Sequence, residues 1–379
     1  MPVEQKDALF TLIKSLSKSE KRQFKLYVGR LGGNADANFM SLFNLLDKVN
    51  VYNEQVVLKK TNIKKQQISN TKAHLYKQIL VSLRLSPIHQ NTRTHLREQF
   101  DFATILYNKG LYKQSLKVLE KAKFLAFEKE EFTLAYELIE LEKVIESQYI
   151  TRSMSDRADV LAVEAKNISQ KNVTLSKLSN LSLQLYSWFL KYGYVRSDKD
   201  YNIVNDYYEA RLPKYDFPSL GFTGKMFLFQ SKLWYGFITQ DFLSCYRYSQ
   251  KLVALFDEYA DMKQLHPVFY LKAVNYSLES LFYLQQTYKF NETLISLEDS
   301  IEYQRFFINE NTQLLSNLYL YQHKINLYYL EGEFKKGTLV VPEILEQISA
   351  FGKKIDQHHV MLFYYKIGCL YFGAGDYEK

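Results

Sequence analysis

A two-helix unit that recurs along the chain is the feature that most constrains its fold. In the best copies an apolar helical stretch ends at a glycine, and an aromatic residue two positions later begins a second helical stretch. Residues 106–122 contain one copy around Gly110, and residues 367–379 contain the first part of another around Gly375. A supersecondary unit repeated at a steady interval is the signature of a solenoid, in which neighbouring units cover each other's apolar faces. The sequence therefore predicts stacked helix pairs.

The turns can be aligned on the aromatic residue that follows each of them. Four copies are clear: Gly110-Leu111-Tyr112, Gln240-Asp241-Phe242, Gly332-Glu333-Phe334 and Gly375-Asp376-Tyr377. Two weaker copies are Tyr194, after Tyr192-Gly193, and Phe290, after Tyr288-Lys289. The steps between successive aromatics are then 82, 48, 48, 44 and 43 residues, and we interpret the first step as two units of 41.

A small side chain recurs three residues after the turn aromatic. These residues are Ser115, Cys245, Thr293 and Gly337. Two antiparallel helices approach closely only where one side chain is short, so we interpret the position as a packing contact. Ala103 and Gly368, each seven residues before a turn glycine, match the facing side of that contact. Cys245 is accordingly expected to be a small buried residue and not a nucleophile.

The spacing of these residues resembles the tetratricopeptide repeat. The residues that carry the resemblance are Ala103, Leu106, Gly110, Tyr112, Ser115, Leu119 and Ala122 in one unit, and Tyr364, Ile367, Gly368, Tyr371, Gly375, Asp376 and Tyr377 in the other. The resemblance covers roughly residues 98–379, and the chain is also similar to bacterial repeat proteins without a known activity. Its interval is longer than the ~34 residues of that repeat and nearer ~40–47. Pro342 should kink or restart one of the second helices.

The expected fold is all-α. Residues 98–379 should form a right-handed superhelical solenoid of antiparallel helix pairs, preceded by a small helical domain over residues 1–86 and a linker over residues 87–97. Pro87 and the polar run His89–Thr94 mark that boundary. A globular helical bundle without stacked repeats is the alternative. We predict no β-sheet of three or more strands.

Five helices are expected in the N-terminal domain, over residues 4–16, about 20–31, 36–49, 54–60 and 64–85. Ser17-Lys18-Ser19-Glu20 has the pattern of a capping box and should begin the second helix. Gly32-Gly33-Asn34 should end that helix. Asp36 can cap the third helix.

Positive charge is concentrated in this N-terminal domain. Residues 1–97 carry 17 Lys/Arg and 6 Asp/Glu, a balance of +11, whereas residues 98–379 carry 32 and 35, a balance of −3. Three helices with short turns, the last of them basic, could form a helix-turn-helix that binds nucleic acid. The lysines that would then face phosphates are Lys59, Lys60, Lys64, Lys65, Lys72 and Lys77, with Gln66, Gln67 and Asn70 near base edges. The alternative is a solvated helix face, favoured because arginine, the preferred base reader, is nearly absent from that helix.

Cysteine usage and hydropathy exclude several classes of protein. Cys245 and Cys369 lie far apart without companion ligands, so neither a disulfide framework nor a zinc site is indicated. The N-terminus lacks the apolar run of a signal peptide, and no uncharged apolar stretch reaches the ~18–20 residues that span a bilayer. We expect a cytoplasmic protein that does not interact with membranes.

No residue pattern indicates catalysis. Gly221-Phe222-Thr223-Gly224-Lys225 lacks the spacing of a phosphate loop and its following Ser/Thr. The seven histidines are scattered, and no serine or cysteine has the setting of a nucleophile. Two acidic clusters are interpreted as solvated helix faces: Glu128, Glu130 and Glu131, and Glu137, Glu140 and Glu142. We expect a protein that is not an enzyme and needs no cofactor or metal.

A scaffold that binds a partner protein or peptide is the function we expect. Stacked helix pairs build an extended concave surface from their first helices. The resemblance to tetratricopeptide domains implies that this surface includes the residue three positions before each turn residue: Tyr107, Phe237, Tyr329 and Phe372. These rings could equally pack against neighbouring repeats. The competing hypothesis is a nucleic-acid-binding regulator that uses the basic N-terminal domain.

The end of the chain interrupts a unit. The small residue that would seat a second helix after Tyr377 is missing, and the last helix carries apolar residues on more than one face: Leu362, Tyr365, Ile367, Leu370 and Phe372. We expect the natural protein to continue through a further helix, or this face to be covered by another molecule, including a second copy.

Overall fold

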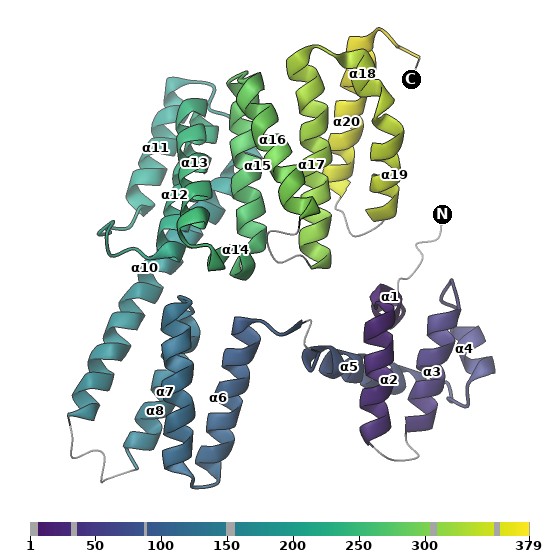
Figure 1. The fold of residues 1–379 in the computed structure, drawn as a ribbon, viewed down its shortest axis with the longest axis vertical. Helices are drawn as coiled ribbons and strands as arrows, with labels where there is room; N and C mark the ends of the chain where they lie inside the picture. Colours follow the sequence, from purple (N-terminus) through teal and green to yellow (C-terminus); the bar gives the residue numbers. More distant parts are fainter. Residues whose placement is uncertain are drawn as a thin grey trace. The chain divides into compact units, whose positions relative to one another are not determined.

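The computed structural model describes residues 7–31, 36–86, 89–148, 156–303, 309–351 and 357–378. Within these ranges the secondary structure is helical and contains no β-strand, which confirms the expected all-α class (Figure 1). The chain divides into two compact units, Met1–His95 and Leu96–Lys379, which are described separately here. The predicted stops at Gly32-Gly33-Asn34 and Pro87 lie outside the described residues.

The first unit packs five helices around one small core. They are α1 (Ala8–Ser15), α2 (Lys18–Leu31), α3 (Asp36–Lys48), α4 (Glu54–Lys60) and α5 (Ile68–Arg84). Phe24 of α2 and Phe43 of α3 meet at the centre with their rings 4.8 Å apart, and Leu75 and Ile79 of α5 are fully buried beside them. The four residues pack as the apolar faces of amphipathic helices do.

The predicted capping box at the start of α2 is confirmed. The Ser17 N–H donates to Glu20 Oε2 at 2.7 Å, and the Glu20 N–H donates to Ser17 Oγ at 3.2 Å. The start predicted for α5 is wrong by four residues, because Lys64–Gln67 forms a turn in which the Gln67 N–H donates to the Lys64 carbonyl at 2.8 Å.

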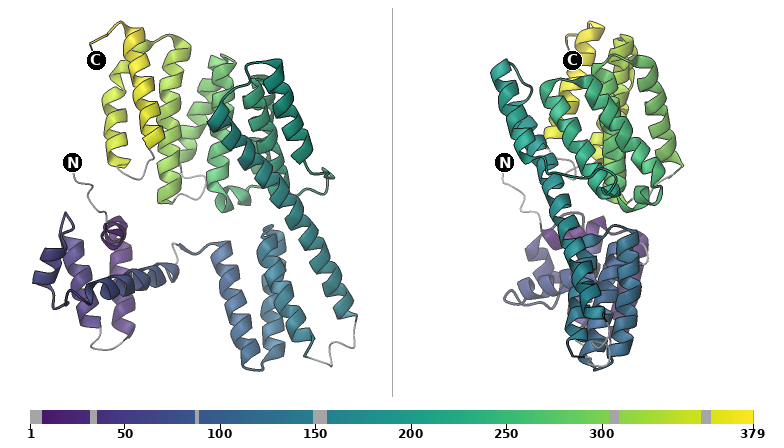
Figure 2. Two further views of the ribbon diagram at one scale, coloured as in Figure 1. Left: turned by 180° about the vertical axis from the view of Figure 1, so that it is seen from behind. Right: turned by 90° about the vertical axis from the view of Figure 1, so that its left-hand side faces the viewer.

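The second unit is a succession of helices that pack against helices close to them in sequence (Figures 1 and 2). They are α6 (Thr92–Asn108), α7 (Tyr112–Glu128), α8 (Phe132–Glu146), α10 (Arg157–Tyr192), α11 (Asp198–Arg211), α12 (Phe222–Thr239), α13 (Phe242–Glu258), α14 (Asp261–Leu265), α15 (Pro267–Tyr283), α16 (Thr287–Glu302), α17 (Glu310–Glu331), α18 (Phe334–Leu339), α19 (Val341–Phe351) and α20 (Gln357–Ala374). This packing is compatible with a helical repeat fold. Residues 92–97 of the expected linker belong to α6, so the linker prediction is wrong there.

Six helices of this unit end with the same backbone geometry. Each ends at a residue of positive φ: Gly110 (75°), Glu130 (54°), Gln240 (60°), Gln285 (54°), Gly332 (69°) and Gly375 (80°). The next N–H then donates to the carbonyl five residues back, as from Leu111 to Leu106 at 2.9 Å. This is the Schellman motif, which satisfies carbonyls at a helix end. From Gln240 onward the turns are 43 to 47 residues apart.

One detail of the predicted repeat is wrong. The turn expected at Tyr288-Lys289 lies at Gln285-Gln286, so Phe290 stands inside α16 and is fully buried. The interval interpreted as two 41-residue units holds α7, α8 and α10, a single helix of 36 residues, and the turn expected between the two units lies outside the described residues. No glycine or proline occurs between residues 157 and 192 to end that helix earlier. The break expected at Pro342 is confirmed, because α18 ends and α19 begins beside it.

The predicted contact of small residues is confirmed at Ser115 and Cys245. Ser115 Oγ donates to the Ala103 carbonyl at 2.7 Å, and Cys245 Sγ donates to the Leu233 carbonyl at 3.6 Å. Both bonds join residues 12 positions apart, so the same contact between paired helices occurs twice.

The contact is also confirmed at Gly337 but not at the remaining predicted positions. A Cβ on Gly337 would lie 2.7 Å from Leu370 Cδ2, so a larger residue there would have to displace the Leu370 side chain. Thr293 is only partly buried and donates to the Lys289 carbonyl of its own helix, because the turn before it was misplaced. A Cβ on Gly368 would meet nothing within 4 Å, and within the described residues no helix follows α20.

Several clusters of buried side chains lie along the second unit, and α10 contributes to more than one of them. Leu161, Ala165 and Ile168 of α10 belong to the core of α6, α7 and α8. Leu181 and Leu185, further along α10, pack with α11 and α12. Figure 2 shows α10 as the long helix that runs from one group of helices to the other.

Glu130 and Glu142 are not on solvated faces, so those two assignments are wrong. Glu130, in the turn between α7 and α8, accepts the first two N–H groups of α12: Phe222 at 2.7 Å and Thr223 at 2.8 Å. A carboxylate thus occupies the helix start at Gly221, where a phosphate loop was considered and rejected. Glu142 is buried and its Oε2 lies 2.6 Å from Lys123 Nζ.

Candidate functional site

Phe237 is a core residue, which overturns its prediction as a partner contact. Only 5% of its surface is exposed. Its ring lies 5.6 Å from that of Trp234 and 6.4 Å from that of Tyr276. A partner molecule could not reach this ring without disrupting the packing between α12 and α15.

The other three residues predicted to contact a partner each pack against the aromatic residue that follows their own turn. The ring pairs are Tyr107 with Tyr112 at 5.8 Å, Tyr329 with Phe334 at 6.1 Å, and Phe372 with Tyr377 at 5.5 Å. Tyr329 also donates its hydroxyl hydrogen to the Lys366 carbonyl. Phe372 is 72% exposed and remains available at the end of α20. The four residues therefore share a position relative to the turns but not one environment.

A row of aromatic side chains, three of them partly accessible and Tyr319 buried, crosses four helices, and we call it the aromatic stripe. It consists of Tyr186 of α10, Trp234 of α12, Tyr276 of α15 and Tyr319 of α17. The Tyr186 and Trp234 rings lie 4.9 Å apart, and the Trp234 and Tyr276 rings 5.4 Å apart. Burial, together with the neighbouring Tyr319 and Tyr186, raises the pKa of the Tyr276 hydroxyl.

Glu279 of α15 and Lys366 of α20 continue this stripe with opposite charges. Glu279 Oε1 accepts a hydrogen bond from Gln322 Nε2 at 2.5 Å, and Lys366 Nζ donates to Asn326 Oδ1. Burial raises the pKa of Glu279, and the attraction of Lys366 offsets this only in part. Burial likewise lowers the pKa of Lys366, with Glu279 acting against it. The two groups influence each other, yet among the described contacts they form no ion pair.

A buried histidine fixes the position of Lys366. His323 Nε2 lies 2.9 Å from Asn275 Oδ1, and its Nδ1 lies 3.3 Å from Asn326 Nδ2. Burial, with the nearby Lys366 charge, lowers the pKa of His323 well below 6.5, so the ring is neutral. A neutral ring can donate through Nε2 and accept through Nδ1. The chain of bonds from Asn275 to Lys366 therefore ties α15, α17 and α20 together.

The predicted nucleic-acid-binding lysines fall into two groups. Lys59 and Lys60 lie in the last turn of α4, Lys64 and Lys65 lie in the turn before α5, and these four and Lys77 are exposed, as are Gln66, Gln67 and Asn70. Lys72 differs, because it pairs with Asp7 and donates to the Tyr52 hydroxyl at 3.0 Å. Burial would lower the pKa of Lys72, but these partners raise it above its ordinary value. Lys72 is therefore a structural residue, which corrects its assignment as a phosphate contact.

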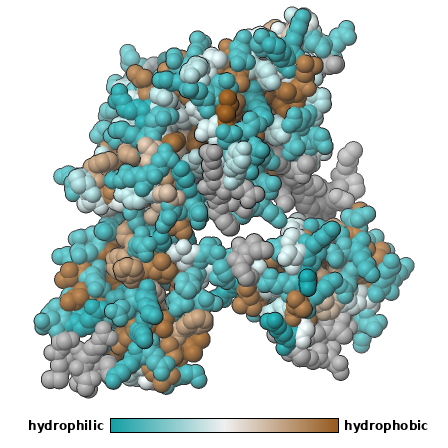
Figure 3. All heavy atoms as spheres, in the orientation of Figure 1, coloured by the Kyte–Doolittle hydropathy of each residue, from teal (hydrophilic) through white to brown (hydrophobic). Residues whose placement is uncertain are grey.

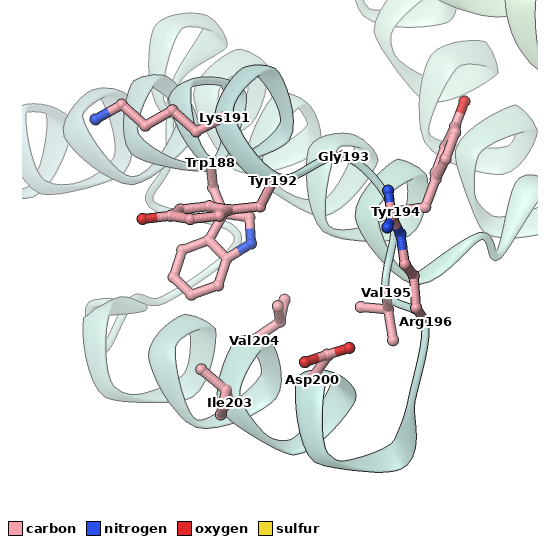
Figure 4. Close-up of a pocket in the computed structure, with 10 residues that line it drawn as sticks. All are labelled: Trp188, Lys191, Tyr192, Gly193, Tyr194, Val195, Arg196, Asp200, Ile203 and Val204. Carbon is pink, nitrogen blue, oxygen red and sulfur yellow. The ribbon is translucent and has the colours of Figure 1, made fainter.

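A pocket of about 360 Å³ lies at the junction of α10 and α11 (Figure 4). Its walls include Trp188 and Tyr192 of α10 and Val204 of α11. Sequence reasoning missed it, although an available signal was that one of the two tryptophans stands beside tyrosines at a helix end.

The surface elsewhere is mixed. On the face shown in Figure 3, hydrophobic residues occur in small groups between hydrophilic ones. Within the described ranges, no group of His, Cys, Asp and Glu side chains is arranged to hold a metal ion. No described helix is both long and apolar enough to cross a membrane.

Comparison with known proteins gives no match: no family model, no curated protein and no solved structure matches the chain. The fold and the contacts within it therefore carry the functional argument.

Proposed function

We propose that residues 96–379 are a non-enzymatic scaffold that binds a partner protein or peptide. The proposed architecture is a tetratricopeptide-like, right-handed solenoid of antiparallel helix pairs. The repeated Schellman turns and the repeated 12-residue contact at Ser115 and Cys245 support equivalent units. In this arrangement α12, α15, α17 and α20 are the first helices of their pairs and form the concave surface.

Glu279 and Lys366 are the observation that carries the proposal. Both are on proposed first helices, and burial shifts the pKa of each toward its neutral form. A pair of opposite charges kept apart at such a cost is not a stabilising device, because desolvation outweighs the attraction. Perturbed groups of this kind concentrate at binding sites.

The aromatic stripe supplies the rest of the proposed contact. Tyr186, Trp234 and Tyr276 offer ring surface that loses little conformational entropy on binding, as interface anchors do. A partner segment lying across α10, α12, α15 and α17 would pack on these rings. Its own polar side chains would reach Glu279 and Lys366, each of which makes one side-chain hydrogen bond among the described contacts.

The test is capture of partners by the intact protein and by a double variant, Glu279→Gln with Lys366→Met. We expect the variant to lose at least about tenfold in affinity for a captured partner while its unfolding midpoint stays level or rises. The matched control is Glu298→Gln with Lys324→Met, which removes a partly buried ion pair of 2.7 Å on the same unit. Equal capture by both variants would contradict the proposal.

A second candidate function is nucleic-acid binding by the first unit. The exposed lysines around the start of α5, together with the basic excess of residues 1–97, favour it. Lys64→Gln with Lys65→Gln should then weaken binding to duplex or single strands and reduce its salt dependence. The control is Lys166→Gln with Lys177→Gln, two exposed lysines of α10. A flat low-salt titration of the intact protein would exclude this function.

A further inference from the structure

The pocket between α10 and α11 is built on a fixed segment of backbone. Gly193 ends α10 with a φ of 69°, a conformation that favours glycine. The chain then runs to the C-terminal end of α12, where the Val195 N–H donates to the Ile238 carbonyl at 2.9 Å. Gln240 Nε2 donates to the Val195 carbonyl, also at 2.9 Å. These bonds hold the pocket in place before any ligand arrives.

Aromatic rings and aliphatic side chains form opposite walls of the pocket. Figure 4 shows Trp188 and Tyr192 of α10 on one side, with Ile203 and Val204 of α11 facing them. The Trp188 ring is held between those of Tyr192 at 5.2 Å and Tyr207 at 5.1 Å. Tyr192 is 66% exposed and Ile203 48% exposed, so apolar surface remains to be covered. The pocket is large enough for a small molecule.

Both signs of charge line the same pocket. Arg196 and Asp200 come from the connection and the first turn of α11, and Lys191 lies on its rim. None of the three forms an ion pair with a described residue. The Asp200 N–H donates to Ser197 Oγ at 3.2 Å, which fixes its backbone and leaves the carboxylate directed to the pocket (Figure 4). Unpaired charges beside an aromatic wall are the polar groups that orient a ligand.

We propose that this pocket binds a free aromatic amino acid in its zwitterionic form. The ring would stack against Trp188 and Tyr192, the carboxylate would meet the Arg196 guanidinium, and the ammonium would meet Asp200. Each charged group of the ligand then has a partner of opposite sign, and its ring covers the exposed wall. An aromatic acid without an ammonium would leave Asp200 uncompensated. This site is separate from the aromatic stripe and does not depend on the scaffold function.

Tryptophan fluorescence gives a direct test, because the chain has only two tryptophans. Trp234→Phe leaves Trp188 as the sole reporter, and phenylalanine is a suitable probe because it does not emit at tryptophan wavelengths. We expect a saturable fluorescence change with phenylalanine, matched by calorimetric titration of the unmodified protein. Leucine, N-acetylphenylalanine and phenylalaninamide each lack one recognised group and should bind at least about tenfold more weakly, as expected for one lost charged hydrogen bond or ring contact.

Two variants and two matched controls locate the binding. Asp200→Asn and Arg196→Gln should each weaken phenylalanine binding by at least about tenfold. Asp198→Asn and Lys199→Gln alter neighbouring charges in the same helical turn that do not line the pocket, and they should bind as the unmodified protein does. The proposal is overturned if phenylalanine shows no saturable binding to the unmodified protein, if leucine binds equally well, or if Asp200→Asn and Asp198→Asn behave alike.

Discussion

Replacing Glu130 by alanine should destabilise the unit formed by residues 96–379, because Glu130 caps a helix that begins 92 residues later. Its Oε1 accepts the Phe222 N–H at 2.7 Å and its Oε2 accepts the Thr223 N–H at 2.8 Å. The residue at the N-cap position of α12 is Gly221, which has no side chain to replace that acceptor. Both N–H groups therefore depend on one distant carboxylate.

The expected loss follows from these two bonds. Removing an N-cap acceptor costs about 0.5–2 kcal/mol, and hydrogen bonds to a charged group are worth about 1.5–3 kcal/mol. Gly221 and Thr223 are partly accessible, so water can recover some of that energy. We expect a decrease of about 2 kcal/mol in the free energy of unfolding, or about 3 °C in Tm for a unit of this size.

Urea and thermal unfolding of Glu130→Ala measure this loss, with Glu137→Ala, an exposed residue of α8, as the control. A double-mutant cycle with Gly221→Ala sharpens the test. A Cβ at Gly221 would lie 2.0 Å from Glu130 Oε1, so this substitution must displace the same carboxylate. It should be costly in the unmodified protein and nearly neutral beside Glu130→Ala. Additive costs, or a Glu130→Ala protein within about 0.5 kcal/mol of the unmodified one, would refute the reasoning.

Four further substitutions test other contacts. Burial lowers the pKa of His323 well below 6.5 in the folded protein. Its contribution to the free energy of unfolding is therefore complete above pH 6.5 and should decrease by about 1.4 kcal/mol per pH unit as the pH falls below that value. His323→Gln should flatten this part of the pH–stability profile. Lys123→Met leaves the buried Glu142 without one of its cations and should cost about 3 kcal/mol in urea unfolding. Phe237→Ala should cost about 3–5 kcal/mol, whereas Phe372→Ala should stay within about 0.5 kcal/mol and would contradict its exposed position if it did not.

The helical class and several turns could be predicted because glycine and proline mark them. Gly110, Gly332 and Gly375 take the positive φ that their positions suggested. The turns at Glu130 and Gln285 could not be found in this way, because those residues give no local signal for a left-handed conformation. Alignment on the aromatic residues therefore placed one turn at Tyr288-Lys289 instead of Gln285-Gln286, and it did not detect the turn at Glu130.

The candidate site was less accessible to sequence reasoning. The sequence predicted where Tyr107, Tyr329 and Phe372 stand relative to their turns. It did not predict burial, because burial depends on which helix packs next, and Phe237 is a core residue. Glu279 and Lys366 belong to no motif and stand on helices separated by four others. They are candidates because burial shifts their pKa values, and burial depends on packing that the sequence does not show.

Two of the three non-glycine residues at these turns make long-range hydrogen bonds with their side chains. A left-handed conformation costs a non-glycine residue about 1–2 kcal/mol, so Glu130 and Gln240 need a compensating contact. Glu130 caps α12, and Gln240 Nε2 bonds the Val195 carbonyl in the connection from α10 to α11. Both side chains fix segments next to α10, the single helix of 36 residues. Gln285, further along the unit, has no such long-range bond among the described contacts. Glycine in place of Glu130 or Gln240 would ease the turn but would leave the segments next to α10 without these bonds.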